Sequence, residues 1–377
     1  MNDLHSFFAS QHFAELPNNI AAHHLQIGKK IEILTEFRGD WADADIIILG
    51  CGEQRGNSVN QAWSHAPDAI REELYKMYDW HPSIKVADLG NLLEGAHISD
   101  TRASLRMVLQ EIYNAGKIAV ILGGSQDLTL QQYDVFKKKE KTINAAVLDS
   151  LIDLEDTENI DDQNYLMEML TGHPNFIRHF SHLGFQSYFV NPNMLETLDK
   201  LRFDCFRLGK IRENLEEMEP VLRHCDLLSV DMKVLRSGEA PFLKEGSPNG
   251  LFGDELCQLI RYAGMSSNLS SLGIYGYRPE DDINRQGAKL IAQMLWYFVD
   301  GFLIRKNESS LESRSEFLEF HVKLTEFETL FLKSKKTNRW WMQTPEHNFI
   351  PCTYLDYLAA SRDEIPERWM REQERIV

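Results

Sequence analysis

Short apolar runs recur along the first three quarters of the chain, and each is followed by a glycine or an aspartate. They are residues 46–49, 118–122, 145–148, 227–230 and 272–275. Continuous apolar runs of this length are typical of strands that are covered on both faces, as in parallel sheets. The pattern therefore predicts five strands of a buried, mostly parallel sheet.

Amphipathic stretches with the spacing of helices separate these runs. They cover residues 101–115, 128–139, 212–223, 253–263 and 284–302. Pro220 is expected to kink or end the third of them, because proline disrupts the interior of a helix. Strand alternating with helix is typical of a parallel sheet between two layers of helices. We therefore predict an α/β fold, a three-layer α/β/α sandwich over residues 36–305, preceded by an N-terminal helical segment, residues 1–35.

The pattern changes after residue 305. Residues 306–316 are polar and predict a loop, and residues 317–324 partly alternate, which predicts a strand. Trp340, Trp341 and Trp369 follow close together, and large aromatic side chains are expected to pack rather than to lie in solvent. Residues 306–377 are therefore interpreted as an ordered C-terminal appendage, packed on the main domain or on a neighbouring subunit.

Composition narrows the range of partners. The 377 residues are 43% hydrophobic and 26% charged, with a net charge of −17. Such a surface repels nucleic acid and anionic membranes, so neither is expected as a partner. No apolar run approaches the roughly 20 residues of a membrane span, and the first residues lack the pattern of a signal peptide. The five cysteines form no CxxC pair and are expected to be reduced, buried thiols of a cytoplasmic protein.

Polar side chains follow three of the predicted strands. They are Gln126, Asp127, Asp149, Asp153, Asp231 and Lys233. Ligand sites of open parallel sheets lie just beyond the carboxyl ends of the strands. We therefore expect these side chains to converge at one edge of the sheet.

The same stretches resemble the three signatures of the ureohydrolase superfamily, which contains the arginases, agmatinases and formimidoylglutamases. The signatures are Gly-Gly-(Ser/Asp)-His, Asp-x-His-x-Asp and Ser-x-Asp-x-Asp. Here residues 123–127 are GGSQD, residues 149–153 are DSLID and residues 229–233 are SVDMK. Their order and separation are similar to those of the family, and formimidoylglutamases look closest.

Three further stretches resemble the family. Residues 66–71 (APDAIR) are similar to a Gly-Pro-x-x-Ile-Arg helix start, and residues 88–91 (DLGN) to an Asp-x-Gly-(Asp/Asn) strand end. Residues 275–279 lie where the family has Glu-(Val/Tyr)-Asn-Pro before its last long helix. The resemblance covers residues 30 to 305, and it implies the α/β/α fold and a homo-oligomer.

The resemblance also implies a metal site, from which this chain departs. Active relatives hold two manganese ions with two histidines and four aspartates, and a hydroxide between the ions attacks the amidine or guanidine carbon. Position by position, Asp149, Asp153 and Asp231 match ligands. At three other ligand positions the chain has different residues: Gln126 and Leu151 replace histidines, and Lys233 replaces an aspartate. Gly276 aligns with the glutamate that would bind the amidinium group of the substrate.

These substitutions oppose the binding of two manganese ions. Imidazole is a preferred ligand of manganese and its neighbours, and leucine ligates nothing. Two unit charges about 4 Å apart interact by roughly 4 kcal/mol at an effective dielectric near 20, so a dication beside the Lys233 ammonium group would be repelled by about twice that. We expect no cofactor, and our hypothesis is that Lys233 replaces the metal by pairing with Asp149, Asp153 or Asp231.

One alternative keeps a single metal ion. Asp149, Asp153 and Asp231, with the side-chain oxygen of Gln126, would form an all-oxygen site that suits magnesium or calcium better than manganese. Elemental analysis of the purified protein would distinguish this alternative from a site without metal.

Two weaker patterns remain open. Residues 50–56 (GCGEQRG) are superficially similar to a dinucleotide loop, but the third glycine is one position late, and a loop at the rim of the pocket is the better interpretation. His173, His179 and His182 offer a general acid or base near the site, or else are surface and core-edge histidines.

Three functions follow from these alternatives. The first is a pseudoenzyme without the two-manganese activity, which binds a small amidine, an amino acid or a protein partner in the remnant pocket. The second is an active hydrolase of linear amidines, formimino or guanidino compounds, with a rebuilt or single-metal site, containing manganese or one oxygen-ligated cation. The third is a structural subunit of a complex.

Overall fold

The computed structural model describes residues 4–9, 20–34, 41–57, 64–155, 160–325 and 327–374. Part of the N-terminal helical segment predicted for residues 1–35 therefore lies outside the described residues. Its described part contains two short 3-10 helices, η1 (His5–Phe7) and η2 (Ile27–Lys29), and then a strand, β1 (Glu32–Ile33). Because β1 pairs with a strand of the main domain, the central sheet begins within this segment.

The main domain is built on a parallel sheet. In the described residues it has nine strands in the order β1-β3-β2-β4-β9-β8-β5-β6-β7, and every neighbouring pair is parallel. The strands after β1 are β2 (Ile46–Gly50), β3 (Val86–Asn91), β4 (Ile118–Leu122), β5 (Ile143–Leu148), β6 (Ile177–Phe185), β7 (Asp204–Arg207), β8 (Leu227–Asp231) and β9 (Ser271–Tyr275). All five predicted strands are confirmed, and the predicted α/β/α class with them.

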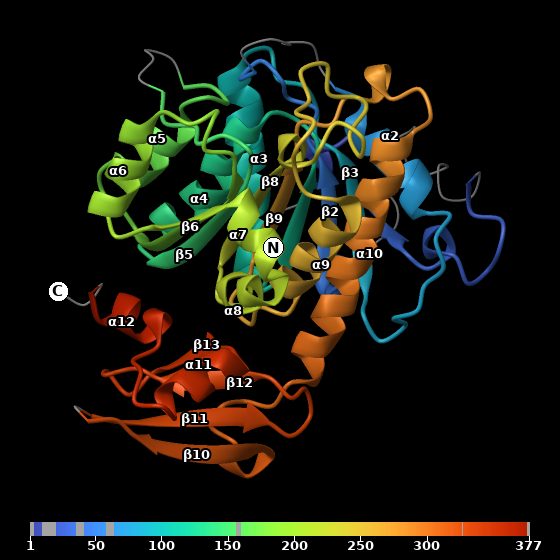
Figure 1. Cartoon of the computed structure of the whole chain (residues 1–377). Coiled ribbons are helices and arrows are strands. Elements are labelled where there is room, and N and C mark those ends of the chain that lie inside the picture. The colour runs from blue at the N-terminus through green and yellow to red at the C-terminus, as the bar shows by residue number, and fades with distance from the viewer. Residues whose placement is uncertain are drawn as a thin grey trace.

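Helices cover both faces of the sheet (Figure 1). One face carries α2 (Ala66–Leu74), α7 (Leu208–Glu213), α8 (Met218–Arg223), α9 (Gly253–Gly264) and α10 (Gln286–Asn307). The other face carries α3 (Ile98–Asn114), α4 (Thr129–Lys138), α5 (Tyr165–Thr171) and α6 (Pro192–Lys200). Alternate residues of each central strand face opposite helix layers. In β2, Ile46 and Ile48 face the first layer, and Ile47 and Leu49 face the second.

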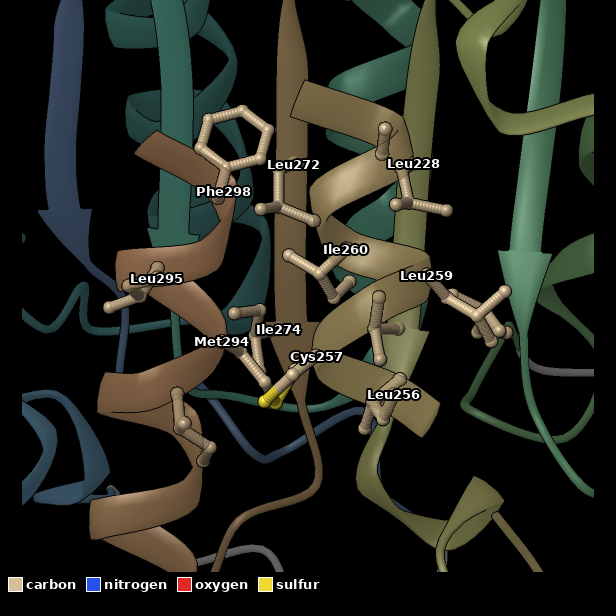
Figure 2. Close-up of a cluster of buried hydrophobic side chains, with 14 of the residues drawn as sticks. Leu228, Leu256, Cys257, Leu259, Ile260, Leu272, Ile274, Met294, Leu295 and Phe298 are labelled. Carbon is tan, nitrogen blue, oxygen red and sulfur yellow. The ribbon is translucent and has the colours of Figure 1, made fainter. Parts of the chain in front are cut away.

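Helix α10 is the most apolar long helix of the chain. Among the described helices it alone has the length and composition to cross a bilayer. Here it packs against α9 so closely that a Cβ atom on Gly301 would lie 2.1 Å from the carbonyl oxygen of Arg261. Figure 2 shows side chains of α9 and α10 gathered against Leu272 and Ile274 of β9. The apolar composition of α10 is therefore accounted for by its place in the core.

The helix predicted for residues 212–223 is wrong as one element. The chain forms α7, a 3-10 turn, η5 (Leu215–Glu217), and then α8. Asn214 breaks the run with φ −154° and ψ 85°. Pro220 does not end a helix either, because it lies in the first turn of α8, where its missing N–H group is not needed.

The appendage is a second, antiparallel sheet. It consists of β10 (Phe317–Lys323), β11 (Glu328–Ser334), β12 (Trp340–Gln343) and β13 (Phe349–Cys352), followed by α11 (Tyr354–Ala360) and α12 (Glu367–Glu374). Trp340, Trp341 and Trp369 are buried, and β10 matches the predicted strand. The appendage packs on the main domain of its own chain, below the parallel sheet in Figure 1. Arg368 of α12, for example, pairs with Glu217 at 2.7 Å.

Candidate functional site

The carboxyl ends of four neighbouring strands bring the predicted site residues together. Gln126 begins the turn after β4, Asp149 follows β5, Asp231 ends β8 and Gly276 follows β9, and these strands lie side by side in the order β4-β9-β8-β5. The expected convergence at one edge of the sheet is therefore present. Its members are largely out of water, because Gln126, Asp149, Asp153 and Asp231 are at most 2% exposed.

Lys233 faces this carboxylate cluster. Its Nζ atom lies 3.4 Å from Oδ2 of Asp231 and 4.0 Å from Oδ2 of Asp162. The chain folds this way because Oδ1 of Asp231 accepts a hydrogen bond of 2.7 Å from the backbone N–H of Lys233, which starts a 3-10 turn, η6 (Met232–Val234). Of the three carboxylates named by the hypothesis, Asp231 is the one within ion-pair distance.

The neighbouring carboxylates keep the ammonium group of Lys233 protonated. Burial alone would lower the pKa of Lys233, but the carboxylates of Asp231, Asp149, Asp153 and Asp162 outweigh burial and raise this pKa well above its ordinary value. The side chain of Lys233 is 31% exposed whereas that of Asp231 is 2% exposed, so Lys233 lies between the buried carboxylates and solvent. Lys233 therefore carries a positive charge at neutral pH, on the solvent side of the carboxylate cluster.

Asp149 and Asp153 differ from Asp231 in their environment. Burial, helped by the Asp231 carboxylate, raises the pKa of Asp149 to about 7. Burial and the Asp149 carboxylate raise the pKa of Asp153 well above its ordinary value. One oxygen of each, Oδ2, has no hydrogen-bond partner. At neutral pH the carboxyl groups of Asp149 and Asp153 therefore retain protons.

Gln126 and Leu151 are uncharged residues beside the carboxylate cluster. Gln126 donates from Nε2 to Oγ of Ser229 at 3.2 Å, while its Oε1 accepts no hydrogen bond. The backbone N–H of Leu151 donates to Oδ1 of Asp149 at 3.1 Å, so this residue contributes its main chain rather than its side chain. Across the residues that the structure describes, no group of three or more histidine, cysteine, aspartate or glutamate side chains is arranged to hold a metal ion.

Gly276 brings its backbone directly against Asp231. It has a φ of +79°, in the left-handed region that favours glycine. A Cβ atom at this position would lie 2.7 Å from Oδ1 of Asp231. The N–H of Gly276 donates to the carbonyl oxygen of Gly124 at 3.1 Å, which fixes the two strand ends together. No side chain fits at residue 276 in this arrangement.

Asp127 and Asp162 are two further carboxylates near the cluster. Asp127 pairs with Arg102 at 2.6 Å. No pattern in the sequence pointed to Asp162, because this residue does not directly follow a strand. It is brought in by Asn57, which donates to its Oδ2 at 2.5 Å, and its own N–H donates to the carbonyl oxygen of Gly56. Gly56, at the end of the loop of residues 50–56, therefore lies next to Asp162.

Of the three candidate histidines, His173 lies exposed in the turn between α5 and β6, and His179 and His182 lie on β6. His179 pairs with Asp204 at 2.9 Å, at the pairing of β6 with β7. His182 is fully buried, and burial lowers its pKa to about 3. It is therefore uncharged at neutral pH and has no proton to donate as an imidazolium group.

Comparison with known proteins extends these observations. The model of the arginase family matches residues 44–300. The formimidoylglutamase of Macrococcus caseolyticus is 24% identical, over 68% of this chain and 84% of that protein. The formimidoylglutamase of Bacillus subtilis is 22% identical, over 71% of this chain and 91% of that protein.

Solved structures agree in fold. A Trypanosoma cruzi formiminoglutamase with Mn²⁺ superposes with a TM-score of 0.65 at 16% identity, covering 71% of this chain and 96% of that one. The agmatine ureohydrolase of Thermoplasma volcanium superposes with a TM-score of 0.61 at 18% identity, covering 78% of this chain and 99% of that one. At these identities the likeness establishes the fold alone.

Proposed function

The chain belongs to the arginase family, and we propose that it is a member in which Lys233 takes the place of the metal ions. In this proposal the remnant pocket binds a small cationic ligand, such as an amidine or an amino acid, and does not perform the ordinary two-manganese hydrolysis. The observation that carries the proposal is the ion pair of Lys233 with Asp231, 3.4 Å apart in the middle of the family's ligand positions.

The donor set supports the proposal. No imidazole is present at the ligand positions, and Leu151 offers no donor atom, so the residues present do not fit two manganese ions. An ammonium group beside Asp231 repels a dication while it neutralises one of the clustered carboxylates. We therefore derive no catalytic step through manganese for this chain.

The charge balance supports a cationic ligand. Four carboxyl groups, those of Asp149, Asp153, Asp162 and Asp231, surround one ammonium group. A bound amidinium or ammonium group would draw protons off the carboxyls with raised pKa, since an opposite charge stabilises the ionised form. Affinity for such a ligand is therefore expected to rise with pH towards and above 7.

The test combines catalysis, binding and metal content. Purified protein is incubated with formimidoylglutamate, arginine or agmatine, with and without Mn²⁺, and formamide, urea and ammonia are measured beside the Bacillus subtilis formimidoylglutamase. We expect no turnover, no manganese by elemental analysis, and binding of at least one of these compounds by calorimetry, tighter at pH 8 than at pH 6. Turnover that rises with Mn²⁺ would overturn the proposal, and so would the absence of binding at both pH values.

A gain-of-function variant gives an independent arm. Gln126→His, Leu151→His and Lys233→Asp together restore the ligand types of the family. We expect this triple variant to bind Mn²⁺ in calorimetry while the wild-type protein does not. Equal Mn²⁺ binding by both proteins would contradict the role assigned to Lys233.

A second candidate function rests on the oxygen atoms without partners. Oδ2 of Asp149, Oδ2 of Asp153 and Oε1 of Gln126 have no hydrogen bond, and three such oxygens suit one magnesium or calcium ion. An amidine hydrolase with a single cation would use them. Stoichiometric Mg²⁺ or Ca²⁺ in the purified protein, with amidine cleavage that EDTA abolishes, would support this candidate over the first.

We further propose a cytoplasmic homo-oligomer, by the resemblance to the family. Light scattering of the purified protein measures the oligomer size, and a monomer at micromolar concentration would contradict this part of the proposal.

A further inference from the structure

One cavity lies between the main domain and the appendage. It has a volume of about 480 Å³. Its upper wall comes from the residues that end α8, α9 and α10, and its lower wall from β12 and β13. Because Arg223 precedes β8 and Asn268 precedes β9, the cavity lies at the amino edge of the sheet, opposite the candidate functional site.

A buried guanidinium group in this cavity has an unused donor. The side chain of Arg223 is 3% exposed. It donates from Nε to Oε1 of Glu219 at 2.6 Å and from Nη2 to the carbonyl oxygen of Trp340 at 2.9 Å. Its Nη1 atom has no hydrogen-bond partner. A buried, charged donor without a partner is costly, so Nη1 is suited to an acceptor that enters the cavity.

Two further arginines line the same cavity. Arg305, in the last turn of α10, donates to the carbonyl oxygen of Leu269 at 3.0 Å. Within the described part of the chain, Arg305 has no carboxylate at ion-pair distance. Arg339, from the turn before β12, lies 3.5 Å from Oε1 of Glu219, the carboxylate that Arg223 already uses. Burial, and then the charge of Arg223, lower the pKa of Arg339 to about 10.

In the described part of the chain, the two acidic residues that line the cavity form no ion pair with these arginines. Glu308 is held by the turn after β11, because its carboxylate accepts hydrogen bonds from Ser334 at 2.6 Å and from Thr337. Glu312 is exposed to solvent. Arginines that end α8 and α10 also interact favourably with helix dipoles, which accounts for their position but leaves Nη1 of Arg223 without an acceptor.

We propose that this cavity binds a small organic molecule through a carboxylate or phosphate group. Guanidinium groups match the geometry of such oxyanions and can bind them with two parallel hydrogen bonds. The hydroxyl of Ser309, which also has no partner, is a further donor to the oxyanion. The rings of Trp341 and Phe349 line the remaining wall, and the Trp341 ring also packs against the Arg223 guanidinium group, 4.4 Å from its centroid.

The ligand would connect the two parts of the chain. Arg223 and Arg305 belong to the main domain, and Arg339 belongs to the appendage. An anion held between them offsets their mutual repulsion and stabilises the contact between the two sheets. The proposal assigns the appendage a role in ligand binding that is independent of the carboxylate cluster.

The experiment measures thermal stability of the full chain in inorganic phosphate and in succinate, at an ionic strength kept constant with sodium chloride. We expect the Tm to rise and saturate with at least one of the two anions, and the preferred one identifies the oxyanion. Arg305→Gln and Arg339→Gln are expected to weaken the apparent affinity by about tenfold. The control Arg106→Gln, which alters an exposed pair with Asp134, should leave it unchanged.

Ser309→Val keeps the test decisive if an arginine variant fails to fold. It removes a hydroxyl with no partner in the fold, so it is expected to weaken anion binding while the circular dichroism spectrum and the Tm without anion stay as in the wild-type protein. A Tm that responds no more to phosphate or succinate than to chloride overturns the proposal. The same anion response in the wild-type protein and all binding-site variants overturns it as well.

Discussion

Arg71 and Asp88 form a buried ion pair that joins the middle of α2 to the middle of β3. Nε of Arg71 donates to Oδ2 of Asp88 at 2.8 Å and Nη2 donates to Oδ1 at 2.9 Å, and both side chains are 0% exposed. Tyr75 donates a third hydrogen bond to Asp88. The two stretches that resemble family sequences at residues 66–71 and 88–91 are therefore partners in space.

Arg71→Leu is expected to destabilise the protein by about 3 to 5 kcal/mol, because Asp88 would keep a buried charge without a counterion. Urea unfolding measures the loss. Lys76→Ala is the control, since its pair with Glu73 is exposed and its removal should change stability by less than about 1 kcal/mol. A loss of similar size in both variants would contradict the importance of burial for the Arg71 pair.

Lys233→Met is expected to lower the free energy of unfolding at pH 8 by about 2 kcal/mol. The cost stays below that of a fully buried pair because Lys233 is 31% exposed. Adding Asp231→Asn to the variant removes the uncompensated charge and should recover part of the loss. If Lys233→Met alone leaves stability unchanged, Lys233 is not the counterion of the cluster.

Asp149→Asn is expected to change the pH dependence of stability. The pKa of Asp149 is raised from 3.8 to about 7 in the folded chain, so folding takes up a proton between these values and wild-type stability falls as pH rises from about 4 to 7. Asparagine has no proton to lose. The variant should therefore gain about 2 to 4 kcal/mol relative to the wild-type protein between pH 4 and pH 8.

The Asp149 experiment is read from urea unfolding at several pH values in EDTA and in Mg²⁺. A bound cation would reverse the result, since the substitution would then remove a ligand and destabilise the protein at pH 8 in Mg²⁺. The two candidate functions thus predict opposite signs for the same variant.

His182→Asn is expected to flatten the loss of stability in acid. Burial lowers the pKa of His182 from 6.5 to about 3, so its contribution is complete above about 6.5 and is lost as pH falls towards 3. A variant without this imidazole loses less stability over that window. His321→Asn, at an exposed position on β10, serves as the control and should follow the wild-type curve in urea unfolding.

Apolar runs predicted the centre of the sheet because those strands are buried on both faces. Strand β6 was not predicted, because four polar residues interrupt its apolar residues: Arg178, His179, Ser181 and His182. These polar groups find partners or become buried only in the folded chain. β7 is a short edge strand with partly exposed residues, so its sequence carries no apolar run. The break at Asn214 depends on a backbone conformation that the amphipathic pattern of residues 212–223 does not reveal.

The candidate site was predictable where residues end strands. Asp149 and Asp231 follow directly from the topology of a parallel sheet, in which strand ends share one edge. Asp162 was not predictable, because it reaches the site through contacts with Gly56 and Asn57, which lie more than a hundred residues earlier. The cavity at the appendage was not predictable either, since its three arginines come from separate elements that only the packing of the two sheets brings together.

The close approach of Gly276 to Asp231 bears on how this chain could change in evolution. A glutamate at position 276 would require the main chain to leave its positive φ and Asp231 to move aside, so several substitutions would have to precede it. The triple variant proposed above would supply the ligand types of the family but no acidic side chain at position 276. A single Gly276→Glu substitution is therefore opposed by steric hindrance and by the backbone conformation of this position.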